Sequence, residues 1–303
     1  MKSVQSRFVD LNGPVHFLDY DGPPGGPIFV LVHGLGGSHT NWLSLAPGLA
    51  LRGRVLVLDL AGFGRTPLDG RSATIESNQA LLNRFIAEVV GEPVVLVGNS
   101  MGGAIAIIQA YEHADSVAGL VLIDPALPRA ARQPMDPQVA MLFAAYMLPV
   151  VAESVVRARI RRLGPERLTM ETIALCTVDA SRVDPEVIEA QVALARERME
   201  SMPWATKALL QAARSLVRAG ARKGEFFNKI RAISAPTLLI AGRRDRLVPI
   251  AAAEAVARMR PDWAFVVFDD VGHIPMLEDS ASTLLAVESW LDGAARIINH
   301  SSA

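Results

Sequence analysis

The chain has 303 residues, and its 30 basic and 31 acidic side chains leave a net charge of −1 at pH 7. This balance excludes the basic surface that nucleic-acid binding needs, and 50% hydrophobic residues exclude a disordered chain. The length suits one core domain with an insertion. The single cysteine, Cys176, excludes an internal disulfide and a cysteine-based metal cluster, and we interpret it as a small apolar packing residue.

Two sequence features indicate where in the cell the protein is expected. The N-terminal residues lack the apolar core of a signal peptide. The longest apolar run, residues 139–152, contains Pro149 and is shorter than the roughly 20 residues of a membrane-spanning helix. We therefore expect a cytoplasmic protein without a transmembrane segment, and the sequence allows a homo-oligomer.

Strands and turns dominate the first 37 residues. Alternating apolar and polar residues over 6–11 and 15–20, around Asn12-Gly13-Pro14, predict an antiparallel hairpin. After a turn-rich linker, the continuous apolar run 28–32 predicts a strand buried on both faces. That strand ends in His33-Gly34-Leu35-Gly36-Gly37, and a loop so rich in glycine can present backbone N–H groups to a ligand.

Helices and strands then alternate. The sequence predicts helices over 38–52, 74–90 and 103–114, and strands over 54–60, 93–97 and 117–123. This alternation is typical of a parallel sheet that is covered by helices on both faces.

The alternation stops near residue 126. Up to residue 231 we find no convincing strand, and helical stretches are predicted over 136–150, 152–163, 165–178, 185–201 and 204–219. Such a segment is too long for a loop and predicts an inserted helical module. Strands at 236–241 and 264–268, with helices at 249–260 and 278–295, resume the earlier pattern.

We therefore predict an α/β fold with a mostly parallel, doubly wound sheet of about eight strands and helices on both faces. An all-helical cap is inserted into it. The predicted core comprises residues 1–125 and 233–303, and the predicted cap comprises residues 126–232.

The main functional signal lies around Ser100. Gly98-Asn99-Ser100-Met101-Gly102 is a G-x-S-x-G sequence between a predicted strand and a predicted helix. This is the arrangement of a nucleophile elbow, where a sharp turn lifts the serine off the sheet and leaves no room for Cβ atoms two residues away. The following helix directs N–H groups at the serine, where they can stabilise negative charge. A glycine-rich turn of another doubly wound protein is the alternative interpretation.

Asp245 and His273 each follow a later predicted strand. Because the loops after parallel strands gather at one edge of the sheet, we expect both residues to lie near Ser100. A serine hydroxyl needs a base, imidazole accepts a proton near neutral pH, and a carboxylate orients the ring. These residues predict nucleophilic catalysis, with the backbone N–H groups of Leu35 and Met101 as oxyanion donors.

Other residues at the predicted strand ends are alternatives to these assignments. Asp124 also ends a predicted strand, but it precedes a proline, and Asp-Pro is an ordinary turn start, so we favour Asp245 as the catalytic acid. We expect structural roles for His33 and Asp59 in their glycine-rich loops. Residues 139–152 either only pack or also line an acyl pocket.

Taken together, the motifs resemble the α/β-hydrolase family. The order Ser100, Asp245, His273 is that family's order. The matching segments are residues 33–37, 59–64, 98–103, 242–249 and 272–273. The resemblance covers nearly all of 1–125 and 233–295, and residues 126–232 occupy the position of the family's variable cap. It implies the fold and the triad but not the substrate, and the predicted site needs neither a cofactor nor a metal.

The resemblance favours a serine hydrolase, of the esterase or lipase kind, that cleaves carboxylic esters of small to medium apolar acyl groups through an acyl-enzyme. Haloalkane dehalogenases and epoxide hydrolases have a similar layout but an aspartate where this chain has Ser100. The substrate would be a small apolar ester or a related carbonyl compound.

Other functions remain open. The string at 98–103 is similar to hydrolases that cleave carbon–carbon bonds in ring-fission products, although those usually place a Trp where Ile274 stands. That activity is the main alternative. A cofactor-free peroxidase and a non-catalytic ligand receptor on the same fold are the less favoured ones.

Overall fold

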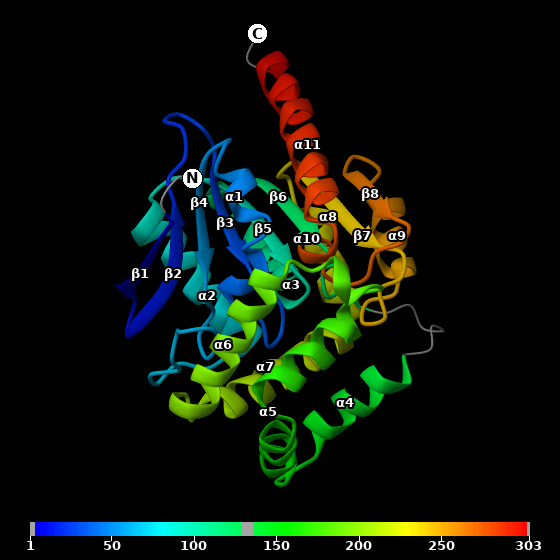
Figure 1. Cartoon of the computed structure of the whole chain (residues 1–303). Helices are drawn as coiled ribbons and strands as arrows, with labels where there is room; N and C mark the ends of the chain where they lie inside the picture. The colour runs from blue at the N-terminus through cyan, green and yellow to red at the C-terminus, as the bar shows by residue number, and fades with distance from the viewer. Residues whose placement is uncertain (1–3, 129–135, 302–303) are drawn as a thin grey trace.

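The computed structural model describes residues 4–128 and 136–301, with side chains described up to residue 293. Within these residues an eight-stranded sheet has the order β1-β2-β4-β3-β5-β6-β7-β8 (Figure 1). The strands are β1 (Val4–Asp10), β2 (Pro14–Tyr20), β3 (Ile28–Val32), β4 (Arg54–Leu58), β5 (Val94–Asn99), β6 (Val117–Ile123), β7 (Thr237–Gly242) and β8 (Ala264–Phe268). The pairs β1–β2 and β2–β4 are antiparallel and the other pairs are parallel, which confirms the predicted mostly parallel α/β sheet.

Two helical layers cover the sheet, because alternate residues of each central strand face opposite sides. In β3, Val30 and Val32 pack in the same buried cluster as α2 (Ile75–Phe85), α3 (Met101–Glu112) and α9 (Ile250–Met259). Phe29 and Leu31 pack on the other side with α1 (Ala46–Leu49), α10 (Pro275–Glu278) and α11 (Ser280–Ser301). Full burial of each large apolar side chain contributes roughly 1.5–3 kcal/mol to stability.

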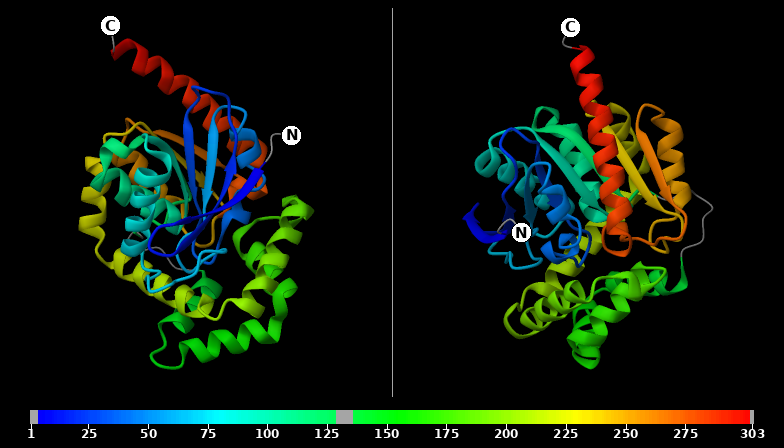
Figure 2. Two further views of the ribbon diagram at one scale, coloured as in Figure 1. Left: turned by 90° about the vertical axis from the view of Figure 1, so that its left-hand side faces the viewer. Right: turned by 45° about the horizontal axis from the view of Figure 1, so that its top comes forward.

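Five helices follow β6 before β7 begins. They are α4 (Pro137–Met147), α5 (Ala152–Cys176), α6 (Pro185–Ser201), α7 (Ala205–Ala221) and α8 (Lys223–Ala232). Helices α4 to α7 lie together beyond one end of the central strands, whereas α11 extends from the opposite end of the molecule (Figures 1 and 2). Helix α8 returns to the core, where Phe226 and Ile230 are buried. Residues 129–135 of the predicted cap lie outside the described residues.

The single helix predicted over residues 38–52 was wrong. The structure has a 3₁₀ turn, His39–Trp42, followed by the short helix α1. Ser38 begins the turn because its Oγ accepts a hydrogen bond from Thr40 N. Pro47 lies in the first turn of α1, where it is tolerated, whereas a proline inside a longer helix would remove one of its hydrogen bonds.

The two helices predicted over 152–163 and 165–178 are confirmed as the two parts of α5, which Gly164 separates with φ 71° and ψ 171°. Other boundaries differ from the prediction. Helix α8 had not been predicted, and the last long helix begins at Ser280 after the separate turn α10. Within the described residues, no helix has the length and apolarity that crossing a membrane requires.

Candidate active site

Ser100 occupies a strained turn between β5 and α3, with φ 54° and ψ −118°. Left-handed backbone is uncommon for a residue other than glycine and is often found at functional sites. A Cβ on Gly98 would lie 2.5 Å from Gly102 O, and a Cβ on Gly102 would lie 2.1 Å from Val32 O. These clashes explain why the positions two residues before and two residues after the serine are glycines.

Asp245 and His273 come from the loops after β7 and β8 and form a buried pair. The Nδ1 of His273 lies 2.6 Å from Asp245 Oδ2. The other carboxylate oxygen of Asp245 accepts hydrogen bonds from Leu247 N at 2.7 Å and Val248 N at 3.0 Å. With its Nδ1 proton directed at the carboxylate, the ring of His273 leaves Nε2 available as a base.

The backbone of His273 is held on both sides. Its N–H donates to Cys176 O at 2.6 Å, and its carbonyl accepts a hydrogen bond from Asn99 Nδ2 at 3.1 Å. Asn99 also donates to Ile123 O at 3.0 Å. The residue before the serine thus connects the end of β5 to the histidine loop.

Glu278 is a further positioning residue that sequence reasoning missed. Its buried carboxylate accepts hydrogen bonds from Gly272 N at 2.8 Å, Val178 N at 2.8 Å and Asp179 N at 2.9 Å. It therefore joins the histidine loop to the chain that leaves α5. Its sequence context, the first charged residue after a proline, offered no signal of this burial.

The loop that carries Leu35 lies directly against the serine. A Cβ on Gly34 would lie 3.0 Å from Ser100 Cβ. In the described part of the chain, neither Leu35 N nor Met101 N donates a backbone hydrogen bond. Both N–H groups belong to segments that border Ser100, so they can serve a developing oxyanion there.

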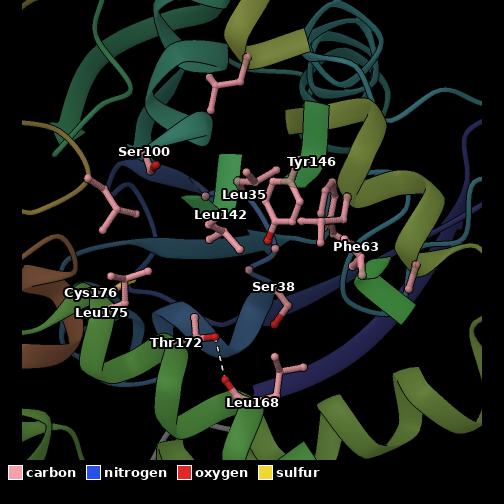
Figure 3. Close-up of a pocket in the computed structure, with 18 of the residues that line it drawn as sticks. Leu35, Ser38, Phe63, Ser100, Leu142, Tyr146, Leu168, Thr172, Leu175 and Cys176 are labelled. Carbon is pink, nitrogen blue, oxygen red and sulfur yellow. Dashed lines mark hydrogen bonds between the residues drawn. The ribbon is translucent and has the colours of Figure 1, made fainter. Parts of the chain in front are cut away.

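Ser100 and His273 both line one cavity of about 840 Å³. Among the described residues, Ser100 Oγ makes no hydrogen bond with His273, and such bonds are often long before substrate binds. Figure 3 shows Ser100 at the cavity together with Leu142 and Tyr146 of α4 and Leu168, Thr172 and Leu175 of α5. Side chains within residues 139–152 therefore line the cavity as well as pack.

Asp124, the rival of Asp245, has a different environment. It ends β6 with φ 41°, and both of its carboxyl oxygens accept from Gly242 N, at 3.0 and 3.2 Å. Burial, together with the nearby Asp245, raises the pKa of Asp124 well above its usual range. Asp124 therefore ties β6 to β7 through Gly242 N, whereas Asp245 contacts the histidine.

Asp59 is the centre of a second buried cluster, with His16 and His39. Its Oδ2 lies 2.7 Å from His16 Nδ1 and 2.8 Å from His39 Nδ1, while Oδ1 accepts from His39 N at 2.6 Å. Burial raises the pKa of Asp59, but the two histidines outweigh it, so the net shift is downward. Of the described residues, these three could offer ligand atoms to a metal ion, yet their mutual hydrogen bonds already satisfy them. We interpret the cluster as a structural brace.

His33 braces the same region from the loop itself. Its Nδ1 lies 2.8 Å from Gly34 O, and its Nε2 accepts a hydrogen bond from Leu60 N at 3.2 Å. Burial lowers the pKa of His33 to about 4, so the ring is neutral at pH 7. Cys176 is unreactive for a related reason, since burial, and then Asp245, raise the pKa of its thiol to about 12.

A comparison with known families decides the assignment. The model of the α/β hydrolase fold matches residues 27–280. The chain belongs to the α/β-hydrolase family. This confirms the resemblance that the motifs predicted, and it identifies the protein as a hydrolase.

Individual relatives of this α/β hydrolase are more distant. A pimeloyl-[acyl-carrier protein] methyl ester esterase of Aeromonas hydrophila is 26% identical over 88% of this chain and 96% of its own length. A 2-hydroxy-6-oxo-6-(2'-aminophenyl)hexa-2,4-dienoic acid hydrolase of Metapseudomonas resinovorans is 26% identical over 96% and 92%. The structure of a thermophilic esterase from Thermogutta terrifontis is 28% identical, with a TM-score of 0.70 over 95% of this chain and 98% of that one.

Proposed function

We propose that this α/β hydrolase cleaves carboxylic esters through an acyl-enzyme on Ser100. The observation that carries the proposal is the 2.6 Å contact between His273 and Asp245 beside the strained turn of Ser100, at the wall of one cavity. A base that is oriented by a carboxylate and placed beside a serine is the arrangement that acyl transfer needs.

The reaction proceeds in two stages. His273 Nε2 takes the proton of Ser100 Oγ as the oxygen attacks the ester carbonyl, and Asp245 stabilises the imidazolium. The N–H groups of Leu35 and Met101 donate to the oxyanion, and each such donor is worth roughly 3–4 kcal/mol of the barrier. His273 then protonates the leaving alcohol, and a water molecule that it activates releases the acid.

Residues 126–232 would act as the cap over this site. Helices α4 and α5 supply much of the apolar cavity wall, including Val139, Leu142, Phe143, Ile160 and Leu168. That lining suits an apolar acyl group. The esterase names of two relatives support the same reaction.

Carbon–carbon hydrolysis of ring-fission products is the second candidate. The relative from Metapseudomonas resinovorans carries the name of such an enzyme. Ile274, where those enzymes usually have a Trp, favours ester hydrolysis instead. A cofactor-free peroxidase and a ligand receptor remain further alternatives, and cytoplasmic location and homo-oligomerisation remain predictions from the sequence.

Steady-state hydrolysis of p-nitrophenyl esters from acetate to palmitate tests the proposal. We expect turnover to peak at short or medium acyl chains. A rise toward palmitate would indicate a lipase. Faster turnover of coloured dienolate ring-fission products than of any aryl ester would contradict ester hydrolysis and support carbon–carbon cleavage.

A further inference from the structure

The cavity carries a charge that the proposed triad does not use. Arg198 of α6 lines it, and in the described part of the chain no carboxylate lies within ion-pair distance of the guanidinium. Its hydrogen bond runs from one terminal guanidinium nitrogen to Gly36 O at 3.1 Å. Gly36 follows the oxyanion donor Leu35, so the guanidinium is anchored to the loop that borders Ser100.

The surroundings of Arg198 leave its charge uncompensated. Burial lowers the pKa of its guanidinium, which nevertheless stays charged at neutral pH. The two acidic residues that act on it are engaged elsewhere: Asp59 is bound to its two histidines, and Glu197 pairs with Arg65 at 3.1 Å. Arg198 is only partly buried, but a partly desolvated cation without a partner anion still favours a ligand that brings one.

Basic residues outnumber acidic ones among the charged side chains that line the cavity. Its charged residues, as far as the chain is described, are Glu171 on the acidic side and Arg157, Arg159, Arg161, Arg198 and Lys223 on the basic side. Glu171 itself pairs with Arg159 at 2.9 Å and with Arg167 at 2.9 Å. Arg157 pairs in turn with Glu153 at 2.6 Å. The excess of basic residues over acidic ones favours ligands of negative charge.

We propose that the natural substrate of this hydrolase is an ester that carries a free carboxylate, and that Arg198 binds this carboxylate. The planar guanidinium matches a carboxylate with two parallel hydrogen bonds. Gly34 lies directly against Ser100. Gly36 is two residues further along the chain, so the Cα atoms of Gly34 and Gly36 are at most about 7 Å apart. A short apolar chain between ester and acid therefore suits the site, as in half-esters of dicarboxylic acids. The proposal rests on the ester-hydrolase function above.

Monomethyl adipate and dimethyl adipate make the test, because they share one acyl skeleton and differ by one charge. We expect kcat/KM of the wild-type protein to be at least roughly 10-fold higher for the monomethyl ester. Arg198→Met should lower kcat/KM roughly 100-fold for the monomethyl ester and less than about 3-fold for the dimethyl ester. Arg198→Lys should restore part of the preference.

Arg196→Met is the matched control, since Arg196 is exposed on the same helix and pairs with Glu166 outside the cavity. It should leave both rates unchanged. Equal losses for both esters in Arg198→Met would overturn the proposal and leave Arg198 as a brace for the Gly36 loop. A wild-type enzyme without preference for the monomethyl ester would overturn it whether or not the variant folds.

Binding separates this proposal from the proposed function. In a Ser100→Ala background, which cannot form the acyl-enzyme, calorimetry should show tighter binding of monomethyl than of dimethyl adipate. Arg198→Met should abolish the difference. Failure of the wild type to hydrolyse either ester, with this difference intact, would refute ester hydrolysis and keep the carboxylate site. Turnover of the esters without any difference in binding would support ester hydrolysis and refute the carboxylate site.

Discussion

Asp124 and Asp245 are buried carboxyl groups at the ends of the neighbouring strands β6 and β7, and the second one reaches His273. Burial, and then the neighbouring Asp245, raise the pKa of Asp124, because a buried site disfavours an ionised carboxylate, and more so beside a like charge. Asp245, and not Asp124, is the carboxylate that contacts His273 Nδ1, at 2.6 Å.

The two aspartates should therefore respond differently to the same isosteric change. Asp245→Asn should lower kcat at pH 7 by roughly 10⁴-fold, because an amide favours the wrong tautomer of His273. Asp124→Asn should stay within about 3-fold of wild type, since an amide oxygen can still accept the hydrogen bond from Gly242 N. Ester hydrolysis by the two purified variants checks this. The opposite ranking would make Asp124 the catalytic acid.

Gly102→Ala tests the steric account of the nucleophile turn. The new Cβ would lie 2.1 Å from Val32 O, a backbone atom that cannot move without shifting β3. We expect a loss of at least about 3 kcal/mol in the free energy of unfolding, measured in urea, or no folded protein. Gly220→Ala, where the new Cβ has open space within 4 Å, is the control and should be neutral or stabilising. Equal stabilities would refute the steric account.

The lowered pKa of the buried His33 should make the stability of the protein depend on pH. Its folded-state pKa of about 4 lies below the usual 6.5, so the unfolded chain binds a proton that the folded protein does not. Stability is therefore lost as pH falls from 6.5 toward 4, and this residue should contribute about 2 kcal/mol of loss between pH 7 and pH 5. Urea unfolding of His33→Asn should show a smaller loss over the same interval. A variant with the wild-type pH profile would contradict the burial of a neutral ring.

Position 150 should accommodate glycine better than the native valine. It is 97% exposed and has φ 62°, a conformation that is unfavourable for a β-branched residue. Val150→Gly should raise the free energy of unfolding by about 1 kcal/mol. Val151→Gly, at φ −91°, should lower it, because there glycine only adds freedom to the unfolded chain. Thermal unfolding compares the two, and equal destabilisation would show that Val150 is not strained.

Sequence reasoning brought Ser100, Asp245 and His273 to one edge because parallel strands leave no other place for the loops that follow them. Each strand was readable as a short apolar run bounded by turn residues. The helix over 38–52 failed because periodicity outweighed the local signals of Ser38 and Pro47.

Residues that act through tertiary contacts were beyond such reasoning. Arg198 sits in a run of alternating charges that reads as a solvated helix face, and Glu278 reads as the start of a final helix. His16 lies on β2, and its approach to Asp59 depends on the antiparallel register of β2 with β4. Local patterns carry no information about how a cap helix docks or which strands pair.

The most direct test of the account is labelling of the protein by a fluorophosphonate, together with p-nitrophenyl butyrate hydrolysis, in wild type and Ser100→Ala. We expect the wild type to be labelled on Ser100 and to hydrolyse the ester, and the variant to lose the label and at least about 10⁴-fold in kcat while keeping its circular dichroism and Tm. Undiminished hydrolysis by a folded Ser100→Ala variant would contradict the central claim that Ser100 is the nucleophile.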